Sequence, residues 1–511
     1  MSASARPLRA PIGAALAAGG GLLHTASFAP TNAWPLQIAG LVLLALALAE
    51  APPRRAAVLG WLFGFAWLAS GFWWLYISLH DFGGLIAPLA ALAIALLAAA
   101  LALYYALAAA LWVRLRGPSL LLNGVVFAAC WLLAELARGT LFTGFPWIAG
   151  GYAHTDGPLA AWAPWIGVYG IGALAAWMAA GAALAWRARK RTAHALALVA
   201  LPIAVVLGVL VLPSDFTRSS GSLAVTLLQS NVAQDSKFEG DQIARVLQWH
   251  HKALAEARGT LVLTPESSIP LPLNLLDNDT LAALRVPFAQ GDRAALVGLF
   301  TGSDAAGYTN SLIALSAASD PSSSTYYRYG KRHLLPFGEF IPPGFGWFVQ
   351  ALNIPIGDQA HGMSIEPLVV GGQRVRPLIC YEDLFGEDIV SSVVGDGAAT
   401  ILANSTNLAW FGAAMVQDQH LQFSRMRALE LQRPIVRATN TGATAVVDHR
   451  GRVVERLPPL VQGALEAAVE GRIGATPYAR WAAAWGLWPL ALAAAFVIAA
   501  AAWVQRHQRT P

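Results

Sequence analysis

The sequence predicts a membrane protein: a bundle of eight helices that carries one water-soluble α/β sandwich domain. Of its 511 residues, 56% are hydrophobic and only 12% are charged, and the mean hydropathy is +0.52. A soluble domain carries about 25% charged residues. Most apolar residues fall in runs of about 20, the length that crosses a bilayer core. Between the last two runs lies a stretch of ordinary soluble composition, large enough for a core of its own.

Eight apolar runs are long enough to span a membrane, and Trp residues cluster near their ends, as in an interfacial belt. We expect the first run to be an anchor rather than a signal peptide, because no convincing small-residue cleavage site follows it. The chain then divides into a bundle (1–212), an external domain (213–480) and a last span with its tail (481–511). The runs are 11–28, 34–50, 57–78, 86–113, 119–138, 159–186, 193–212 and 482–504.

Basic residues in the short connections predict the orientation of the bundle, because Lys and Arg favour the cytoplasmic side. Twelve of them fall on one side, and the short loops of the other side hold only Arg138. Both termini should therefore be cytoplasmic, and the domain 213–480 should lie outside the cytoplasm. The twelve are Arg6, Arg9, Arg54, Arg55, Arg114, Arg116, Arg187, Arg189, Lys190, Arg191, Arg506 and Arg509.

Glu135 and Arg138 are unusual in the fifth span. They are three residues apart and therefore share a helix face. A local ion pair that makes the helix end tolerable in lipid is the simpler interpretation, although an acid within a span can also mark a functional site. We find no row of ionisable residues and no pair of broken helices, features that a transporter usually needs.

Short strands alternate with a few helices in the external domain, a pattern that predicts a layered α/β sandwich. Helices are expected at roughly 239–257 and at 417–433. Two strands, 310–315 and 324–329, are expected to form a hairpin. The other expected strands are 222–230, 260–266, 294–299, 368–370, 375–380, 399–402, 435–437, 443–448 and 453–454.

Three residues at strand ends suggest acyl-transfer chemistry. Glu266 and Cys380 each end a predicted strand and Lys331 follows another, and strand ends converge on a crevice in such folds. The carboxylate can take the thiol proton, and the ammonium can lower the thiol pKa and stabilise an oxyanion. The thiolate can then attack a carbonyl and hold the acyl group as a thioester.

Each of these residues also has an ordinary structural explanation. A free Cys is often simply buried, a Glu at a strand end is usually solvated, and a Lys in a polar loop is usually surface. His333 is an alternative base in a Cys–His pair. The compartment favours a reactive thiol, because a lone cysteine in an oxidising space is unusual unless it reacts. The other cysteine, Cys130, is expected inside the fifth span and cannot be its partner.

Three blocks around these residues resemble the carbon–nitrogen hydrolase (nitrilase) superfamily, whose catalytic set is Glu, Lys and Cys in this order. Eight spans with such a domain before the last one resemble the bacterial apolipoprotein N-acyltransferases. Further stretches that resemble that family lie around Trp131, Gly144, Asn407 and Arg425. The three blocks are Thr264–Glu266, Gly330–Glu339 and Ile379–Glu382.

The resemblance implies an αββα sandwich and a reaction in two halves. Cys380 would take an acyl chain from a phospholipid, and the α-amine of a diacylglyceryl-cysteine at a lipoprotein N-terminus would then accept it. Glu266 would be the base, Lys331 would stabilise the oxyanion, and Glu339 would hold Lys331 or assist the proton transfers. Tyr381 and Glu382 follow the nucleophile as in the family and are assigned to substrate binding, although a structural role for Glu382 stays open. The expected location is the bacterial inner membrane, with the domain in the periplasm.

Apolar loops beside the predicted crevice suggest contact with lipid. One, 268–276, follows Glu266, and the other, 342–352, follows Glu339. They either pack on the core of the domain or dip into the bilayer, and Pro and Gly supply hinges for the second alternative. We expect lipid contact, with Trp347 and Phe348 of the second loop, and Trp410 and Phe411 beyond it, binding substrate.

The expected partners are a phospholipid donor, a diacylated apolipoprotein acceptor and the lipid bilayer, with no metal and no cofactor. Nucleic acid is not expected, because cytoplasmic Arg anchors explain most of the net charge of +5. Three alternatives stay open: a membrane-tethered amidase of the nitrilase type, a transporter with an external ligand-binding domain, and a scaffold with an inactive enzyme domain.

Overall fold

The computed structural model describes residues 9–188, 192–235, 240–323, 326–344, 346 and 358–507. The chain forms two compact units, and each is considered by itself. The helical unit holds Met1–Tyr76, Ile86–Ser214 and Ala484–Pro511. The sandwich unit holds Ile77–Leu85 and Asp215–Ala483.

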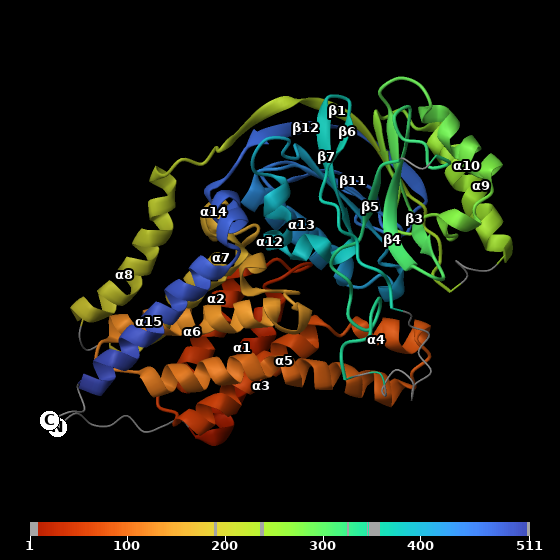
Figure 1. Cartoon of the computed structure of the whole chain (residues 1–511). Coiled ribbons are helices and arrows are strands. Elements are labelled where there is room, and N and C mark those ends of the chain that lie inside the picture. Colours follow the sequence, from red (N-terminus) through yellow and green to blue (C-terminus); the bar gives the residue numbers. More distant parts are fainter. Residues whose placement is uncertain are drawn as a thin grey trace, which may run out of the picture. The chain divides into compact units, whose positions relative to one another are not determined.

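A helix lies at each of the eight runs predicted to span a membrane (Figure 1). Among the described residues, five helical segments are long and apolar enough to cross a bilayer: Ala87–Leu115, Leu120–Thr143, Pro158–Arg187, Thr192–Val211 and Trp488–His507. The helices are α1 (Ala10–Ala26), α2 (Trp34–Leu48), α3 (Pro53–Gly71), α5 (Ala87–Leu115), α6 (Leu120–Thr140), α7 (Ala163–Arg187), α8 (Thr192–Gly208) and α15 (Trp488–His507).

The predicted count of eight spans is not confirmed. A sixth span is reached only if α3 and the following segment Leu75–Phe82, bent by 62°, count as one. That segment comprises α4 (Leu75–Ile77) and a π-helical turn (Ser78–Phe82). Helices α1 and α2 have 17 and 15 residues. At about 1.5 Å per residue they are shorter than a hydrocarbon core of about 30 Å.

The buried pair in α6 is the local ion pair that the sequence suggested. Arg138 Nη2 lies 3.4 Å from Glu135 Oε1, and both side chains are almost fully buried. The pair also fixes the chain that follows α6. Arg138 donates to the carbonyls of Phe145 and Trp147 at 2.8 and 2.9 Å, and Glu135 accepts from the Gly150 amide at 2.6 Å. These contacts satisfy polar groups that lipid could not solvate.

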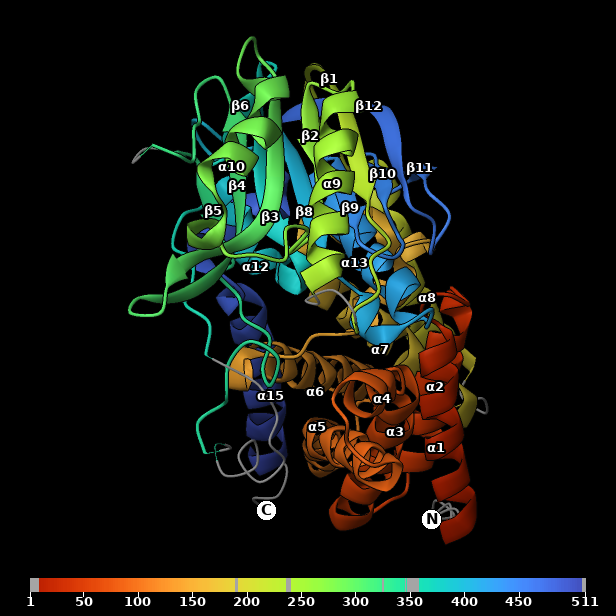
Figure 2. The same ribbon diagram turned by 90° about the vertical axis from the view of Figure 1, so that its right-hand side faces the viewer.

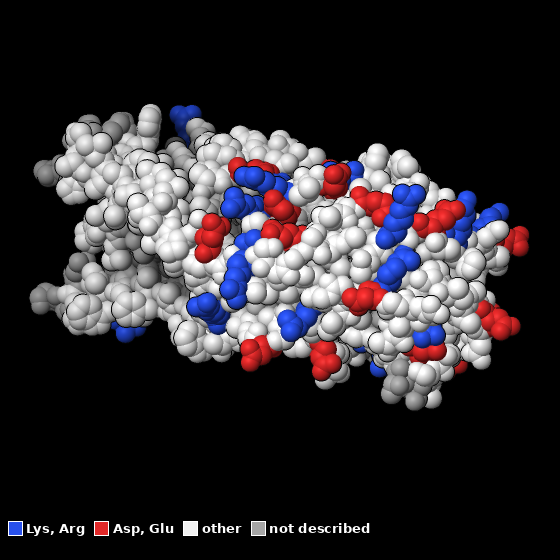
Figure 3. Space-filling view, turned by 90° about the horizontal axis from the view of Figure 1, so that it is seen from above, with Lys and Arg blue, Asp and Glu red and all other residues white. Residues whose placement is uncertain are grey.

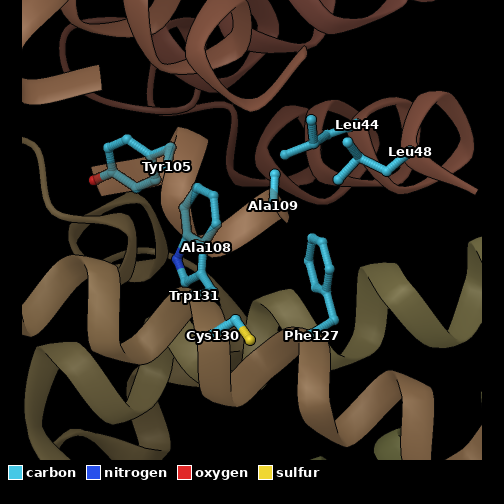
Figure 4. A pocket seen from close by; sticks show the side chains of 8 residues that line it. All are labelled: Leu44, Leu48, Tyr105, Ala108, Ala109, Phe127, Cys130 and Trp131. Carbon is cyan, nitrogen blue, oxygen red and sulfur yellow. The ribbon is translucent and has the colours of Figure 1, made fainter. Parts of the chain in front are cut away.

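Cys130, the second cysteine, lies on α6 beside an apolar hollow (Figure 4). The hollow is lined by side chains from α2, α5 and α6, and no acid or basic side chain lines it. The thiol is 3% exposed. A buried Cys in such surroundings behaves as a small hydrophobe. The lining residues are Leu44, Leu48, Tyr105, Ala108, Ala109, Phe127, Cys130 and Trp131.

The sandwich unit contains two six-stranded sheets (Figures 1 and 2). The first, in spatial order, is β12 (Gly463–Gly474), β1 (Thr217–Gln229), β2 (Leu261–Leu263), β3 (Ala294–Ser303), β4 (Gly307–Ser316) and β5 (Arg328–Gly330). The second is β11 (Val453–Arg456), β10 (Ala445–Val447), β9 (Ile435–Thr439), β8 (Ile401–Thr406), β7 (Gln373–Ile379) and β6 (Leu368–Val370).

Both faces of the central strands are buried, which makes them continuous apolar runs. In β3, Ala294 and Leu296 enter the core between the sheets, while Ala295 and Val297 pack beneath helices. The first sheet is covered by α9 (Gly240–Glu256) and α10 (Asn278–Arg285), which lie outside β3 and β4 in Figure 1. The second is covered by α12 (Gly386–Ile389), α13 (Val416–Leu431) and α14 (Pro477–Trp485). This is the expected αββα order.

Four elements of the sandwich were not predicted from the sequence, and one expected detail differs. They are strand β12, which pairs with β1 along almost its whole length, and the helices α10, α12 and α14. The expected hairpin exists as β4 and β5, although residues 324 and 325 lie outside the described part. Strand β8 was expected to end before Asn404 but continues to Thr406.

Acidic and basic side chains are interspersed on the face of the molecule seen in Figure 3. Among the described residues of that view they do not gather into a broad patch of one sign.

Candidate active site

The three predicted catalytic residues all stand at strand ends. Lys331 directly follows β5, and Glu266 comes three residues after the end of β2; both strands belong to the first sheet. Cys380 directly follows β7 of the second sheet and begins a 3₁₀ turn (Cys380–Leu384). The two sheets share one core, so strand ends from both sheets form a single site.

Lys331 is the centre of a buried charged group. Its Nζ lies 2.6 Å from Glu339 Oε1 and 3.2 Å from Glu266 Oε1, and its side chain is 1% exposed. Burial by itself lowers the pKa of Lys331, but the charges of Glu266, Glu339 and Cys380 outweigh it and raise the pKa well above its ordinary value. The ammonium is therefore charged at neutral pH, as an oxyanion partner must be.

The carboxylate of Glu266 is held by two asparagines as well as by Lys331. Asn310 Nδ2, from β4, donates to Oε1 at 2.7 Å. The backbone N–H of Asn407, just after β8, donates to Oε2 at 2.9 Å. Neither asparagine was predicted to have a role. A polar residue inside the apolar run of β4 was the available signal for Asn310.

Glu339 is the second acid bound to Lys331. Its other oxygen, Oε2, accepts from the Leu335 amide at 2.8 Å. Burial, with the negative charge of Glu266, raises the pKa of Glu339 despite the opposing charge of Lys331. Two carboxylates around one ammonium repel each other, and this repulsion favours a proton on one of them.

Cys380 has a left-handed backbone, with φ of +54°. A residue with a Cβ rarely adopts this conformation, and such strain concentrates at functional sites. Burial and then Glu266 raise the pKa of the thiol well above its ordinary value, while Lys331 lowers it. The resting thiol is therefore protonated at neutral pH, and it needs a base to become a nucleophile.

His333, the alternative base, is engaged elsewhere. Its Nδ1 lies 3.1 Å from Asp388 Oδ2, and its ring stacks on Phe385 at 3.5 Å. The side chains whose charges act on the Cys380 thiol most strongly are Glu266, Lys331, Glu339 and Asp383. The described residues thus favour Glu266 over a Cys–His pair.

Glu382 differs from the expectation that it contacts substrate. Its carboxylate is buried and already bonded: Oε2 accepts from the Tyr329 hydroxyl and the Ile379 amide, both at 2.7 Å. Oε1 accepts from the amides of Arg332 and His333 at 2.7 and 3.3 Å. The side chain joins the end of β7 to the chain after Lys331, which is a structural role.

Tyr381, the other residue assigned to substrate binding beside the nucleophile, is also buried. Its hydroxyl donates to the Leu334 carbonyl at 2.6 Å, and Lys331 Nζ lies 5.7 Å from the centre of its ring. The phenol ring thus packs against the ammonium group of Lys331, where a cation–π contact is favourable.

The apolar loops have different environments. Ile269 and Leu276 of the loop 268–276 pack into the core beneath α9 and α10, so this loop mainly covers its own domain, although Leu275 is 62% exposed. Of the two alternatives for this loop, its packing favours the one in which it covers the core. Trp347 and Phe348 lie outside the described residues. Trp410 is 41% exposed, as a lipid-contacting residue would be.

Trp410 and Phe411 lie in a 3₁₀ turn (Ala409–Phe411), and the Trp410 ring contacts Phe82 edge-on with centroids 5.9 Å apart. Phe82 belongs to the short segment Ile77–Leu85, which is part of the sandwich unit although it follows α3 in sequence.

Comparison of the sequence with known proteins shows the family of the chain. The profile of the apolipoprotein N-acyltransferase N-terminal domain matches residues 20–181, and that of carbon–nitrogen hydrolases matches 225–478. An apolipoprotein N-acyltransferase of Verminephrobacter eiseniae is 47% identical over 481 residues, covering 89% of each chain. The chain belongs to the apolipoprotein N-acyltransferase family. Another member, from Ralstonia nicotianae, is 47% identical and covers 92% of this chain and 89% of its own.

The sandwich is thus the carbon–nitrogen hydrolase domain of an apolipoprotein N-acyltransferase family member. A solved carbon–nitrogen hydrolase superfamily protein from Xanthomonas campestris covers 52% of this chain and 96% of its own, with 16% identity and a TM-score of 0.35. This likeness is too weak to bear on function.

Proposed function

We propose that this protein transfers an acyl chain from a phospholipid to the N-terminal α-amine of a diacylglyceryl-cysteine on apolipoproteins, through a thioester on Cys380. The observation that carries the proposal is the buried ammonium of Lys331, which lies between the carboxylates of Glu266 and Glu339 and whose charge opposes the rise in the pKa of the Cys380 thiol. Family membership supplies the substrate class.

In the first half of the reaction, Glu266 accepts the thiol proton and the sulfur attacks the ester carbonyl of the phospholipid. The charge that develops on the carbonyl oxygen is stabilised by Lys331. The C–O bond then breaks, and the leaving lysophospholipid oxygen takes the proton back from Glu266. The products are the acyl-thioester of Cys380 and a lysophospholipid.

In the second half, the α-amine of the acceptor attacks the thioester carbonyl. Glu266 accepts a proton from the amine, Lys331 again stabilises the oxyanion, and the C–S bond breaks. The proton passes from Glu266 to the departing sulfur, which restores the thiol and leaves an amide on the acceptor. Glu339 holds Lys331 between the carboxylates throughout both halves.

The membrane arrangement that fits this chemistry has both termini in the cytoplasm of a bacterial cell and the external domain, 213–480, on the periplasmic side of the inner membrane. The flanking parts, 1–212 and 481–511, would anchor it. Basic residues in the short connections support this orientation. The phospholipid donor would come from the bilayer itself.

The phospholipid donor would enter the site from the outer leaflet, past four aromatic side chains: Trp347, Phe348, Trp410 and Phe411. The support is their apolar character, the position of 342–352 directly after Glu339, and the exposure of Trp410. Aromatic side chains are favoured at a membrane–water interface.

The experiment that tests the function supplies the purified full-length protein with a phospholipid carrying a labelled acyl chain and a diacylglyceryl-cysteine peptide with a free amine. Transfer of the label to the peptide supports the proposal. A matched peptide with an acetylated amine should accept none. Hydrolysis of small amides without any transfer would instead favour the amidase alternative and contradict the proposal.

A further inference from the structure

The two carboxylate oxygens of Glu266 accept different numbers of hydrogen bonds. Oε1 accepts from Lys331 Nζ at 3.2 Å and from Asn310 Nδ2 at 2.7 Å. Among the described residues, Oε2 accepts only from the backbone N–H of Asn407, at 2.9 Å. Each oxygen of an ionised carboxylate has about two lone-pair sites. Oε1 is therefore saturated and lies beside a positive charge, whereas Oε2 keeps one site for the proton of the Cys380 thiol.

The side chain of Asn407 holds the backbone N–H that reaches Oε2. Asn407 directly follows β8, where pairing within the strand ends, and it is 7% exposed. Its Oδ1 accepts from Asn440 Nδ2 at 3.0 Å and from the Ala409 backbone N–H at 3.2 Å, and its Nδ2 donates to Gln234 Oε1 at 2.9 Å. A backbone N–H can only donate, so the contact with Ala409 fixes which end of the amide is the oxygen.

Asn440 uses the whole hydrogen-bonding capacity of its side chain. The residue directly follows β9 and is 2% exposed. Its Oδ1 accepts from the Val232 N–H at 2.9 Å and from Ser230 Oγ at 3.0 Å. Its Nδ2 donates to the Val232 carbonyl at 2.8 Å and to Asn407 Oδ1. A side-chain amide has two N–H donors and two acceptor sites, and all four are occupied here.

The backbone of Asn440 joins the same strand ends. Its N–H donates to the carbonyl of Thr406, the last residue of β8, at 3.0 Å, and its carbonyl accepts from the Asn231 N–H, just beyond β1, at 2.7 Å. Strands β8 and β9 belong to the second sheet, and β1 lies beside β2, which leads to Glu266, in the first. A change at Asn440 should therefore move Asn407 relative to Glu266.

We propose that Asn440 is a positioning residue for the general base. Through Asn407 it holds Oε2 of Glu266 as the oxygen that takes the proton when the S–H bond of Cys380 breaks. The amide cluster thus fixes the place of one N–H donor as well as joining three strand ends. This inference rests on the proposed function, in which Glu266 is the base and Cys380 the nucleophile.

The test measures the rate of alkylation of Cys380 by iodoacetamide in the full-length protein in detergent. Peptide mass spectrometry separates Cys380 from Cys130, and kcat, KM and the thermal unfolding transition are measured beside it. In Asn440→Ala, alkylation and kcat should fall roughly 10- to 100-fold, as expected for a misplaced reacting group, with KM little changed. Asn407→Ala keeps the backbone N–H but loses the contact with Asn440, and it should show the same slowing if Asn440→Ala does not fold.

A background without the carboxylate separates positioning from general damage. Because Asn440 acts through Glu266, Asn440→Ala should change the alkylation rate by less than about twofold in a protein that already carries Glu266→Gln. Slowing by the same factor in both backgrounds would overturn the inference, since the effect would then not pass through the base.

Gln229→Ala is the matched control. Gln229 is a buried amide at the end of β1, and its Nε2 donates to the carbonyls of Pro458 and Val461 at 2.8 and 2.7 Å. In the described part of the chain its side chain makes no hydrogen bond to Asn407 or Asn440. The change should lower the unfolding temperature while leaving alkylation within about twofold. Equal slowing in this control, or unchanged alkylation in Asn440→Ala, would contradict the inference.

Alkylation does not depend on any acyl substrate. If Asn440→Ala slows alkylation only where the Glu266 carboxylate is present, and the unaltered protein transfers no acyl chain, the positioning role is sustained and only the proposed function is contradicted.

Discussion

Lys331 makes its shortest ion pair with Glu339 rather than with the predicted base: Nζ lies 2.6 Å from Glu339 and 3.2 Å from Glu266. Because Lys331 pairs more closely with Glu339, Glu266 is less tightly bound to the ammonium group. A base that is completely neutralised by an ion pair is a poor proton acceptor.

Replacement of Glu339 should therefore impair the chemistry more than binding. Glu339→Gln keeps an acceptor but removes the charge, so Lys331 should draw closer to Glu266 and weaken it as a base. We expect kcat for acyl transfer to fall about 10- to 1,000-fold, with a smaller change in KM. Steady-state kinetics with a labelled phospholipid measures both, and an unchanged kcat would contradict a role for Glu339.

The alkylation rate of Cys380 should depend on pH, and the charge of Asp383 should shift this dependence. Burial is the main reason that the pKa of the thiol is raised, and the charges of Glu266, Glu339 and Asp383 add to it while Lys331 opposes it. Alkylation should therefore still increase with pH above pH 9. Asp383→Asn removes a charge that disfavours the thiolate, so its profile should shift to lower pH. A shift to higher pH would contradict this account of the electrostatics.

The aromatic loop residues should matter for lipid substrates and not for the thiol itself. Replacing Trp347 and Phe348 by Ser should slow turnover with phospholipid micelles far more than alkylation of Cys380, because only the lipid has to enter past an apolar loop. Trp410→Ser should have the same effect if it belongs to the same entrance. Equal loss of both activities would remove the support for a lipid gate.

Arg138→Met should destabilise the helical unit. The change leaves the buried carboxylate of Glu135 without its cation and the carbonyls of Phe145 and Trp147 without their donor. Breaking a buried pair on one side costs about 3–5 kcal/mol. The unfolding temperature should fall by several degrees, and the double variant with Glu135→Gln should be less destabilised than the sum of the single variants. Strict additivity would show that the pair does not interact.

Local pattern was enough to locate Glu266, Lys331 and Cys380, because each follows an apolar run at a strand end. Contacts between residues far apart in the sequence could not be predicted from local pattern. Asn310 and Asn407 hold Glu266 from two different sheets. Glu382 was assigned to substrate binding because some of its four hydrogen-bond donors belong to residues about 50 positions earlier, and local pattern does not show these contacts. Their roles depend on the completed fold.

Strand β12 and the number of membrane spans could not be predicted from local pattern either. The sequence Gly463–Gly474 is only weakly apolar and alternates buried with exposed positions, and it becomes a strand by pairing with β1, about 240 residues earlier. The apolar runs predicted where helices occur, but length and bending decide which of them can cross a membrane.

Mass spectrometry of the intact protein after incubation with phospholipid tests the central claim most directly. We predict a fatty-acyl mass on Cys380 that is absent in Cys380→Ala and released by a diacylglyceryl-cysteine peptide with a free amine but not by its acetylated form. Transfer of the acyl chain to the peptide without any adduct on Cys380, or an adduct that persists in Cys380→Ala, would contradict the account.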